Sequence, residues 1–217
     1  RLFRTLSILL LIVGWGSTLS AAEWRDLLVG DSLSGWVFDI KDGTDPDAIY
    51  TIDDGVMTVA GKDKSLAVIR TVEKFAEYDL QFEWRWMDQP GNSGCLIHCS
   101  EPRFMNVWPK SIEVQVGHPN AGDFIYIGET IDVPDAQLPA DMSGWRVRLR
   151  DNLTDDSEKS PGQWNRMHVK VRGDTVTVWV NGDLVNHGTN PSVKSGAICF
   201  QAEGANLQYR KMRIMAW

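Results

Sequence analysis

Residues 78–86 read Tyr-Asp-Leu-Gln-Phe-Glu-Trp-Arg-Trp, and their side chains alternate strictly between apolar and polar. Because successive side chains of a strand point to opposite faces, this period of two predicts a β-strand with one buried face. Residues 111–116 and 175–180 alternate in the same way, and residues 163–171 do so less cleanly. An Asn-Gly pair at 181–182 then predicts a tight hairpin turn.

Working outward, three further segments read as strands, at residues 93–99, 196–202 and 207–215. Outside the N-terminal segment we find no stretch with helical periodicity, and residues 134–161 are polar and irregular, which indicates a long loop. Many short strands joined by turns that contain glycine or proline predict an all-β antiparallel sandwich or jelly roll. Since there is no linker and no internal repeat, we expect one domain over residues 23–217.

The composition and charge of the chain disfavour some classes of function. The chain has 217 residues, of which 43% are hydrophobic and 24% charged, as is ordinary for a globular protein. Its 22 Lys and Arg stand against 29 Asp and Glu, so we expect neither nucleic acid nor an anionic membrane as partner. The three cysteines are expected as buried thiols. Cys95 and Cys99 point the same way on one strand and cannot bridge each other, but either could reach Cys199.

The first 22 residues resemble a secretory signal peptide. Arg1 and Arg4 supply a positive start, residues 6–16 an apolar run, and residues 20–22 the small side chains of a cleavage site. The apolar run is shorter than the ~20 residues that cross a bilayer, so an anchor is disfavoured. We expect an exported protein, periplasmic or extracellular, with residues 1–22 removed and no membrane attachment afterwards.

One sheet face carries many polar groups. If four of the predicted strands are neighbours, alternation places on one concave surface Glu83, Arg85, His98, Glu113, Gln115, Gln201 and Glu203. Antiparallel sheets often expose one solvated face, which is the simpler interpretation. The mixture of carboxylate, amide, imidazole and guanidinium groups nevertheless favours a site. Asn92 and Ser93 form a turn whose side chains can point into the same groove.

Two of the ten tryptophans, Trp108 and Trp145, fall in predicted loops. A loop tryptophan often stacks on a sugar ring, because its apolar face and polar edge match those of a carbohydrate. The alternative, a ring folded into the body of the protein, stays open. A divalent metal is possible, although an acidic loop at residues 39–47 lacks the spacing of an EF-hand and the histidines lack that of a zinc site.

Several motifs occur together along the chain. They are Leu-Ser-Gly-Trp at 33–36, the strand at 78–85, Gly-Asn-Ser-Gly at 91–94, Ile-Glu-Val-Gln-Val at 112–116, Gly-Gln-Trp-Asn at 162–165, Val-Asn-Gly at 180–182, Gln-Ala-Glu-Gly at 201–204 and Tyr-Arg-Lys-Met-Arg-Ile at 209–214. In this order the chain resembles the 3-keto-disaccharide hydrolase family, formerly a domain of unknown function. The resemblance implies an antiparallel β-sandwich jelly roll of the concanavalin A-like lectin or glucanase type. Pro90 and His98 depart from the family pattern, which often has Gly and Arg there.

The resemblance also implies a carbohydrate-active enzyme that cleaves 3-keto-glycosides by elimination and hydration. Such a reaction needs a base near C2 of the sugar, a cation or donor for the enolate oxygen and a proton source for the leaving group. We expect Glu113 or His98 as the base, and Arg85, or a metal held by Glu83, Glu113, His98 or Glu203, at the enolate. The expected sugar contacts are Asn92, Ser93, Gln115, Gln201, Glu203, Trp108 and Trp145.

Two alternatives remain. A retaining glucanase carries the strand motif E-x-D-x-E, with two carboxyl groups ~5 Å apart. Here Glu113 is present but Gln115 replaces the middle Asp, so direct hydrolysis is disfavoured unless Glu83 or Glu203 completes a pair. A non-catalytic carbohydrate-binding module is the other alternative, because the same jelly roll also serves lectins.

Overall fold

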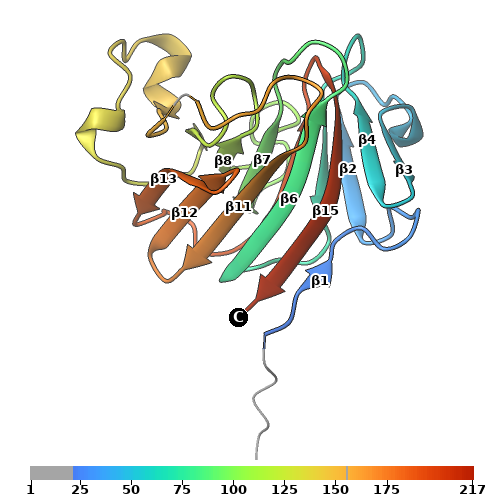
Figure 1. Cartoon of the computed structure of the whole chain (residues 1–217), viewed down its shortest axis with the longest axis horizontal. Helices are drawn as coiled ribbons and strands as arrows, with labels where there is room; N and C mark the ends of the chain where they lie inside the picture. The colour runs from blue at the N-terminus through green and yellow to red at the C-terminus, as the bar shows by residue number, and fades with distance from the viewer. Residues whose placement is uncertain (1–21, 155) are drawn as a thin grey trace, which may run out of the picture.

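The structure is a computed structural model that describes residues 22–154 and 156–217. Two antiparallel sheets pack face to face (Figure 1), which confirms the predicted all-β sandwich. The predicted export segment lies outside the described residues except for Ala22, so it stays a prediction. No helix in the described part of the chain is long and apolar enough to span a membrane.

The eight-stranded sheet is nearest the viewer in Figure 1. Its order is β13 (Asp183–Thr189), β12 (Thr175–Val180), β11 (Asn165–Arg172), β6 (Tyr78–Trp86), β15 (Asn206–Ala216), β4 (Val56–Ala60) and β3 (Tyr50–Asp53), with β1 (Arg25–Asp26) paired to β15. The deciding stretch of sequence, β6, therefore lies near the middle of this sheet, between β11 and β15.

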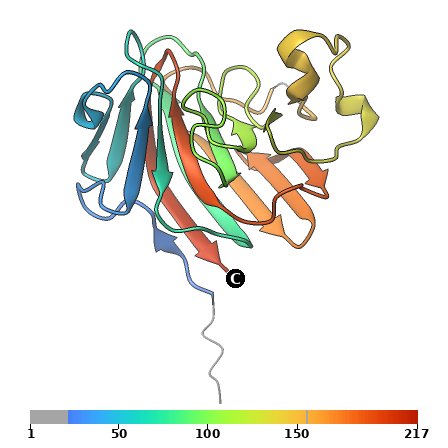
Figure 2. The same ribbon diagram turned by 180° about the vertical axis from the view of Figure 1, so that it is seen from behind.

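The seven-stranded sheet forms the other layer and faces the viewer in Figure 2. Its order is β10 (Leu149–Arg150), β9 (Phe124–Ile127), β8 (Ser111–Gln115), β7 (Gly94–Cys99), β14 (Ala197–Ala202), β5 (Ala67–Thr71) and β2 (Trp36–Ile40). Three short 3-10 helices complete the described elements, namely η1 (Pro46–Ala48), η2 (Asp135–Gln137) and η3 (Gly144–Arg148). The last two lie in the predicted irregular region 134–161, which projects from one end of the sandwich.

The core lies between the two sheets. The apolar side chains of β6 are all buried there, as the alternation predicts. Phe82 of β6 meets Phe200 of β14 with ring centroids 5.2 Å apart, and it meets Tyr209 of β15 at 5.7 Å. Burying one such ring contributes about 1.5–3 kcal/mol, so this aromatic contact across the layers is one of the many contacts that hold the sheets together.

The alternation fails at the end of β7, and two predictions about this strand are wrong. His98 adopts a positive φ of 53°, and the register of β7 with β14 shifts next to it. The ring of His98 therefore turns into the interior against Tyr78, with Nδ1 3.0 Å from the carbonyl oxygen of Val193. Cys99 is displaced to the outer side of the strand, so it does not point the same way as Cys95.

The shift brings Cys99 next to Cys199 of the adjacent strand. Both are free thiols whose Sγ atoms lie 2.6 Å apart, whereas Cys95 lies on the inner side of β7. Of the two bridges that the sequence left open, only the one between Cys99 and Cys199 is sterically accessible.

We expect Cys99 and Cys199 to pair when the protein is incubated with oxidised glutathione, while Cys95 stays a thiol. Burial raises the pKa of the Cys199 thiol, so pairing should be faster at alkaline pH. Thiol titration after denaturation should find one thiol per chain instead of the three of the reduced protein. A Cys199→Ser variant serves as control and should keep both of its thiols; three thiols in the treated wild type would contradict the pairing.

Candidate functional site

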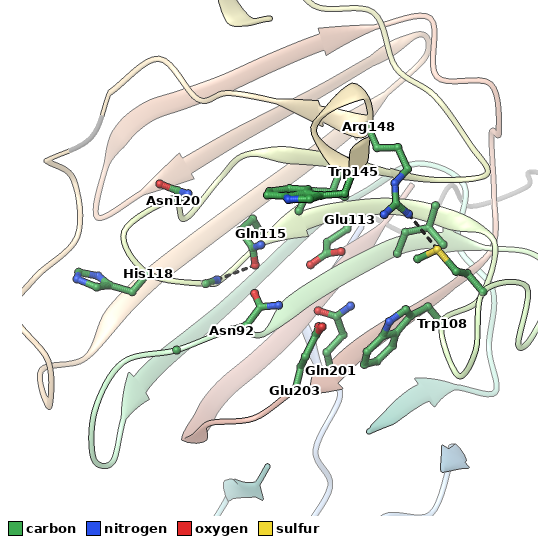
Figure 3. A pocket seen from close by; sticks show the side chains of 15 residues that line it. Asn92, Trp108, Glu113, Gln115, His118, Asn120, Trp145, Arg148, Gln201 and Glu203 are labelled. Atoms are coloured by element: carbon green, nitrogen blue, oxygen red, sulfur yellow. Dashed lines mark hydrogen bonds between the residues drawn. The ribbon is translucent and has the colours of Figure 1, made fainter. Parts of the chain in front are cut away.

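A pocket of about 470 Å³ opens on the outer face of the seven-stranded sheet (Figure 3). Its polar lining comes from β8, β14, the turn before β7, the turn after β8 and η3, and comprises Asn92, Glu113, Gln115, His118, Asn120, Arg148, Gln201 and Glu203. Trp108 and Trp145 also line it. Six of the predicted sugar contacts and one predicted catalytic carboxylate therefore meet in one place.

The floor of the pocket is built on three adjacent strands. Glu113 on β8 and Gln201 on β14 flank β7, where Gly94 lies between them. A Cβ atom at position 94 would lie only 2.2 Å from Oε1 of Glu113 and 2.5 Å from Oε1 of Gln201. Glycine at this position lets the two side chains converge over β7, and any larger residue would displace them.

Glu113 is 4% exposed and ionises with difficulty. Burial, and secondly the charge of Glu203, raise its pKa to about 8, although a hydrogen bond from Gln201 and the charge of Arg148 act in the opposite direction. At neutral pH the carboxyl group of Glu113 is therefore mostly protonated. A neutral buried acid of this kind can donate a proton to a leaving group and can accept one at higher pH.

Glu203 lies at the end of β14 and faces the same pocket (Figure 3). A backbone bridge to Asn92 holds its position, and the side chain of Asn92 hydrogen-bonds to its carboxylate. Burial outweighs this bond and raises the pKa of Glu203. The charge of Glu203 opposes ionisation of Glu113, so the two neighbouring carboxyl groups ionise in succession and not together.

The side-chain amide oxygen of Gln201 is an unused hydrogen-bond acceptor. Its Oε1 is buried and has no hydrogen-bond partner among the described residues. A buried polar atom without a partner costs about 1–3 kcal/mol, and a ligand hydroxyl could donate to it. A polar group of a bound ligand would supply the hydrogen bond that this oxygen lacks.

Aromatic rings form the walls. Trp145 on η3 is 54% exposed, and in Figure 3 its ring lies across the carboxyl groups from that of Trp108. Arg148, from the same 3-10 helix, points down beside Glu113 and donates through Nη1 to Sδ of Met105 at 2.9 Å. Arg148 was missed by the sequence analysis, because the irregular region gives no periodicity that would assign it to a face.

A histidine-carboxylate pair lies at the rim. Nδ1 of His118 is hydrogen-bonded to Oε2 of Glu158, whose other oxygen accepts from the backbone N–H of Ala121 at 3.1 Å. Burial raises the pKa of Glu158. His118 points away from Glu113 in Figure 3, so it borders the entrance. The sequence analysis gave His118 no role, because the histidines lack the spacing of a zinc site.

Four predicted site residues lie elsewhere, and their predicted placement was wrong. Glu83 and Arg85 are on the outer face of the eight-stranded sheet, where Glu83 pairs with Arg210 at 2.6 Å and Arg85 donates to Gln208 at 2.9 Å. Alternation identified their face of β6 correctly but not the sheet to which β6 belongs.

His98 and Ser93 point inward instead of into the groove. His98 is buried against Tyr78, and burial lowers its pKa. Ser93 is fully buried, with Oγ donating to the carbonyl oxygen of Gln201 at 2.8 Å and lying 3.0 Å from the hydroxyl of Tyr209. Ser93 is therefore a support beneath the floor, and His98 cannot be a base for a ligand in this pocket.

The predicted metal ligand set is also separated. Glu113 and Glu203 face the pocket, but Glu83 lies on the opposite sheet and His98 in the core. Within residues 22–154 and 156–217 there is no group of three or more His, Cys, Asp or Glu side chains arranged to hold a metal ion. The four residues cannot ligate one ion together.

Known proteins resemble this chain in sequence family and in fold. A model of the 3-keto-α-glucoside-1,2-lyase-like domain family matches residues 23–215. Two provisionally named glycosyl hydrolases from Parabacteroides distasonis superpose with TM-scores of 0.64 and 0.62, at 17% and 21% identity, covering 90% and 89% of this chain and 100% and 94% of theirs. The carbohydrate binding module CBM66 from Bacillus subtilis superposes with a TM-score of 0.54 at 8% identity, covering 84% of this chain and 96% of its own. No curated protein sequence matches the chain.

Replacement of Glu113 by Gln should remove a pH dependence of stability. In the unfolded chain Glu113 ionises near its ordinary pKa of 4.5, whereas in the folded protein its pKa is about 8. Between these values only the folded state keeps the proton, so wild-type stability falls as pH rises, by up to ~1.4 kcal/mol per pH unit. Urea unfolding of both proteins at several pH values measures the difference; curves that stay parallel from pH 5 to 8 would contradict the shift.

Proposed function

This chain belongs to the family of 3-keto-α-glucoside-1,2-lyase-like domains, and we propose from that premise that it cleaves 3-keto-glycosides by elimination followed by hydration. The reaction takes place in the pocket around Glu113. The observation that carries the proposal is a buried carboxyl group with a pKa of about 8 beside a second carboxyl group. Such a pair supplies an acid and a base at the same pH.

The chemistry starts from the ketone at C3 of the sugar. It acidifies the hydrogen on C2, and removal of that proton gives an enolate on the C3 oxygen. The enolate re-forms the ketone and a C1–C2 double bond while the C1–O bond breaks, and the leaving oxygen takes up a proton. Water then adds at C1 and a proton returns to C2, so the net change is hydrolysis of one glycosidic bond.

Each step has a candidate group in the pocket. Glu203 is assigned as the base at C2, because it lines the pocket beside Glu113 and its charge is the second cause, after burial, of the raised pKa of Glu113. Glu113, protonated at neutral pH, is assigned as the acid that protonates the leaving oxygen. Arg148 replaces the misplaced Arg85 as the cation for the enolate oxygen. Gln201 accepts from a sugar hydroxyl through its unpaired Oε1.

Non-catalytic carbohydrate binding is the second candidate function. Trp145 presents an exposed ring, and the carbohydrate binding module named above has the same fold. A non-catalytic lectin-like protein would bind sugar between Trp108 and Trp145 without using the shifted carboxyl groups. Incubation with 3-keto-trehalose separates the two functions, because only the enzyme releases free glucose.

The roles of the two carboxyl groups can be distinguished by the leaving group. Loss of a general acid or base lowers the rate by ~10²–10⁴-fold. We expect Glu113→Gln to slow cleavage of an alkyl 3-keto-glucoside by this order but to spare a 4-nitrophenyl 3-keto-glucoside, since nitrophenolate leaves without a proton. Glu203→Gln should slow both substrates and should abolish exchange of the C2 hydrogen with deuterated solvent. Rates are followed by product chromatography and by NMR.

Glu73→Gln is the matched control, because Glu73 is an exposed partner of Arg25 and does not line the pocket. It should retain wild-type rates with both substrates. If Glu113→Gln and Glu203→Gln also retain them, the proposed chemistry is wrong. If both variants cleave the two substrates equally slowly, the assignment of separate acid and base roles is wrong, but the pocket is still the active site.

Gly94→Ala tests whether activity requires the side chains of Glu113 and Gln201 to converge over β7. The added methyl group would meet side-chain oxygens and not backbone, so those side chains can move aside and the fold should be retained. Misplacing two pocket groups in this way should lower kcat by ~10²-fold. Thermal melting checks the fold and steady-state kinetics the rate; an unchanged kcat in a folded variant would contradict the positioning role of Gly94.

A further inference from the structure

A second pocket lies on the outer face of the eight-stranded sheet, on the other side of the sandwich from Glu113. Its volume is about 590 Å³, and it is larger than the first pocket. It extends over β11, β12 and the middle of the β6–β15 pair. It is lined by Lys159, Trp164, Arg166, His168, Trp179 and Arg210. None of these residues has a part in the proposed cleavage.

Two tryptophans are fixed in this pocket by their neighbours. Trp179 of β12 pairs across the sheet with His168 of β11, and their rings stack with centroids 4.8 Å apart and planes 22° apart. His168 is itself held by Asp79, at 2.5 Å from Nε2 to Oδ1. Trp164 lies beneath the guanidinium group of Arg210, which is 3.9 Å from the ring centroid. The rings are therefore oriented before any ligand arrives.

The charge of this pocket is opposite to that of the whole chain. The protein carries a formal charge of −7, yet the pocket gathers Lys159, Arg166 and Arg210 around one acid, Glu83. Glu83 is already bonded to Arg210 and Lys211, and although burial raises the pKa of Glu83, these hydrogen bonds lower it overall. The local surplus of positive charge is thus permanent near neutral pH.

Arg166 has donors that no carboxylate occupies. Its Nη2 donates to the neutral amide oxygen of Gln81 at 2.5 Å, and the structure gives it no acidic partner among the described residues. Arg210 lines the pocket and uses Nε for Glu83, while its guanidinium group lies over the ring of Trp164. Guanidinium groups of this kind bind carboxylates through paired hydrogen bonds.

We propose that this second pocket binds an acidic saccharide, with a sugar ring against Trp179 and a uronate carboxylate on Arg166 and Arg210. The ring of Trp179 stacks on the C–H face of a pyranose. The arginines pair with the negative charge of a uronate, which a neutral sugar lacks. Because the site is on the opposite sheet, the protein can hold an acidic glycan while the pocket around Glu113 remains open. The proposal does not depend on the proposed function.

Affinity electrophoresis of the full chain through gels that contain polygalacturonate tests the site. We expect retardation of the wild type by polygalacturonate but not by neutral dextran, and a weaker retardation at high salt. Arg166→Gln and Trp179→Ala should each weaken binding by ~10-fold, as expected for the loss of a charged hydrogen bond or of a stacking ring. Trp179→Phe should restore most of the binding.

Two controls separate this site from its alternatives. Arg25→Gln removes one positive charge from another part of the surface and should not change retardation, and Trp145→Ala alters only the first pocket and should not change it either. Retardation lost in Trp145→Ala, retained in Trp179→Ala, or absent from the wild type would overturn the proposal. Equal retardation by single-stranded DNA that is insensitive to Trp179→Ala would also overturn it, because it would indicate a general polyanion surface.

Discussion

Burial of apolar side chains between the two sheets, Phe82 against Phe200 among them, holds the sheets together and also determines where polar groups can lie. Because side chains alternate along a strand, an inward Phe200 makes Gln201 face outward, and an inward Val114 does the same for Glu113. The polar floor is thus a geometric consequence of the apolar core. The two sheets leave two outer faces, and each of them carries one of the pockets described above.

Alternation predicted the strands and the face of Glu113, Gln115 and Gln201 correctly, since these depend only on the period of two. It could not predict that β6 lies in the other sheet, because alternation says which side a residue faces and not which strands are neighbours. The displacement of His98 comes from a register shift and a positive φ at a residue other than glycine, and neither has a sequence signal. Arg148 lies on the short helix η3, in a region whose sequence shows no period that would assign it to a face.

The floor of the first pocket is costly to the folded state. A carboxyl group is kept neutral by burial, and a buried amide oxygen of Gln201 has no partner in the described part of the chain. Residues that served stability alone would be replaced by apolar ones of similar shape. Departures from good packing of this kind are concentrated at functional sites, where a ligand completes the missing contacts. The carbohydrate-active family to which the chain belongs agrees with this interpretation.

The two walls of the first pocket differ in how they are attached. Trp108 is buried and belongs to an apolar cluster on the sheet surface, whereas Trp145 is exposed and is carried by the five-residue helix η3, which directly precedes the two-residue strand β10. Because Trp145 lies on a segment separate from the strands that carry Glu113 and Gln201, substitutions in that segment can change the width of the pocket without altering its polar floor.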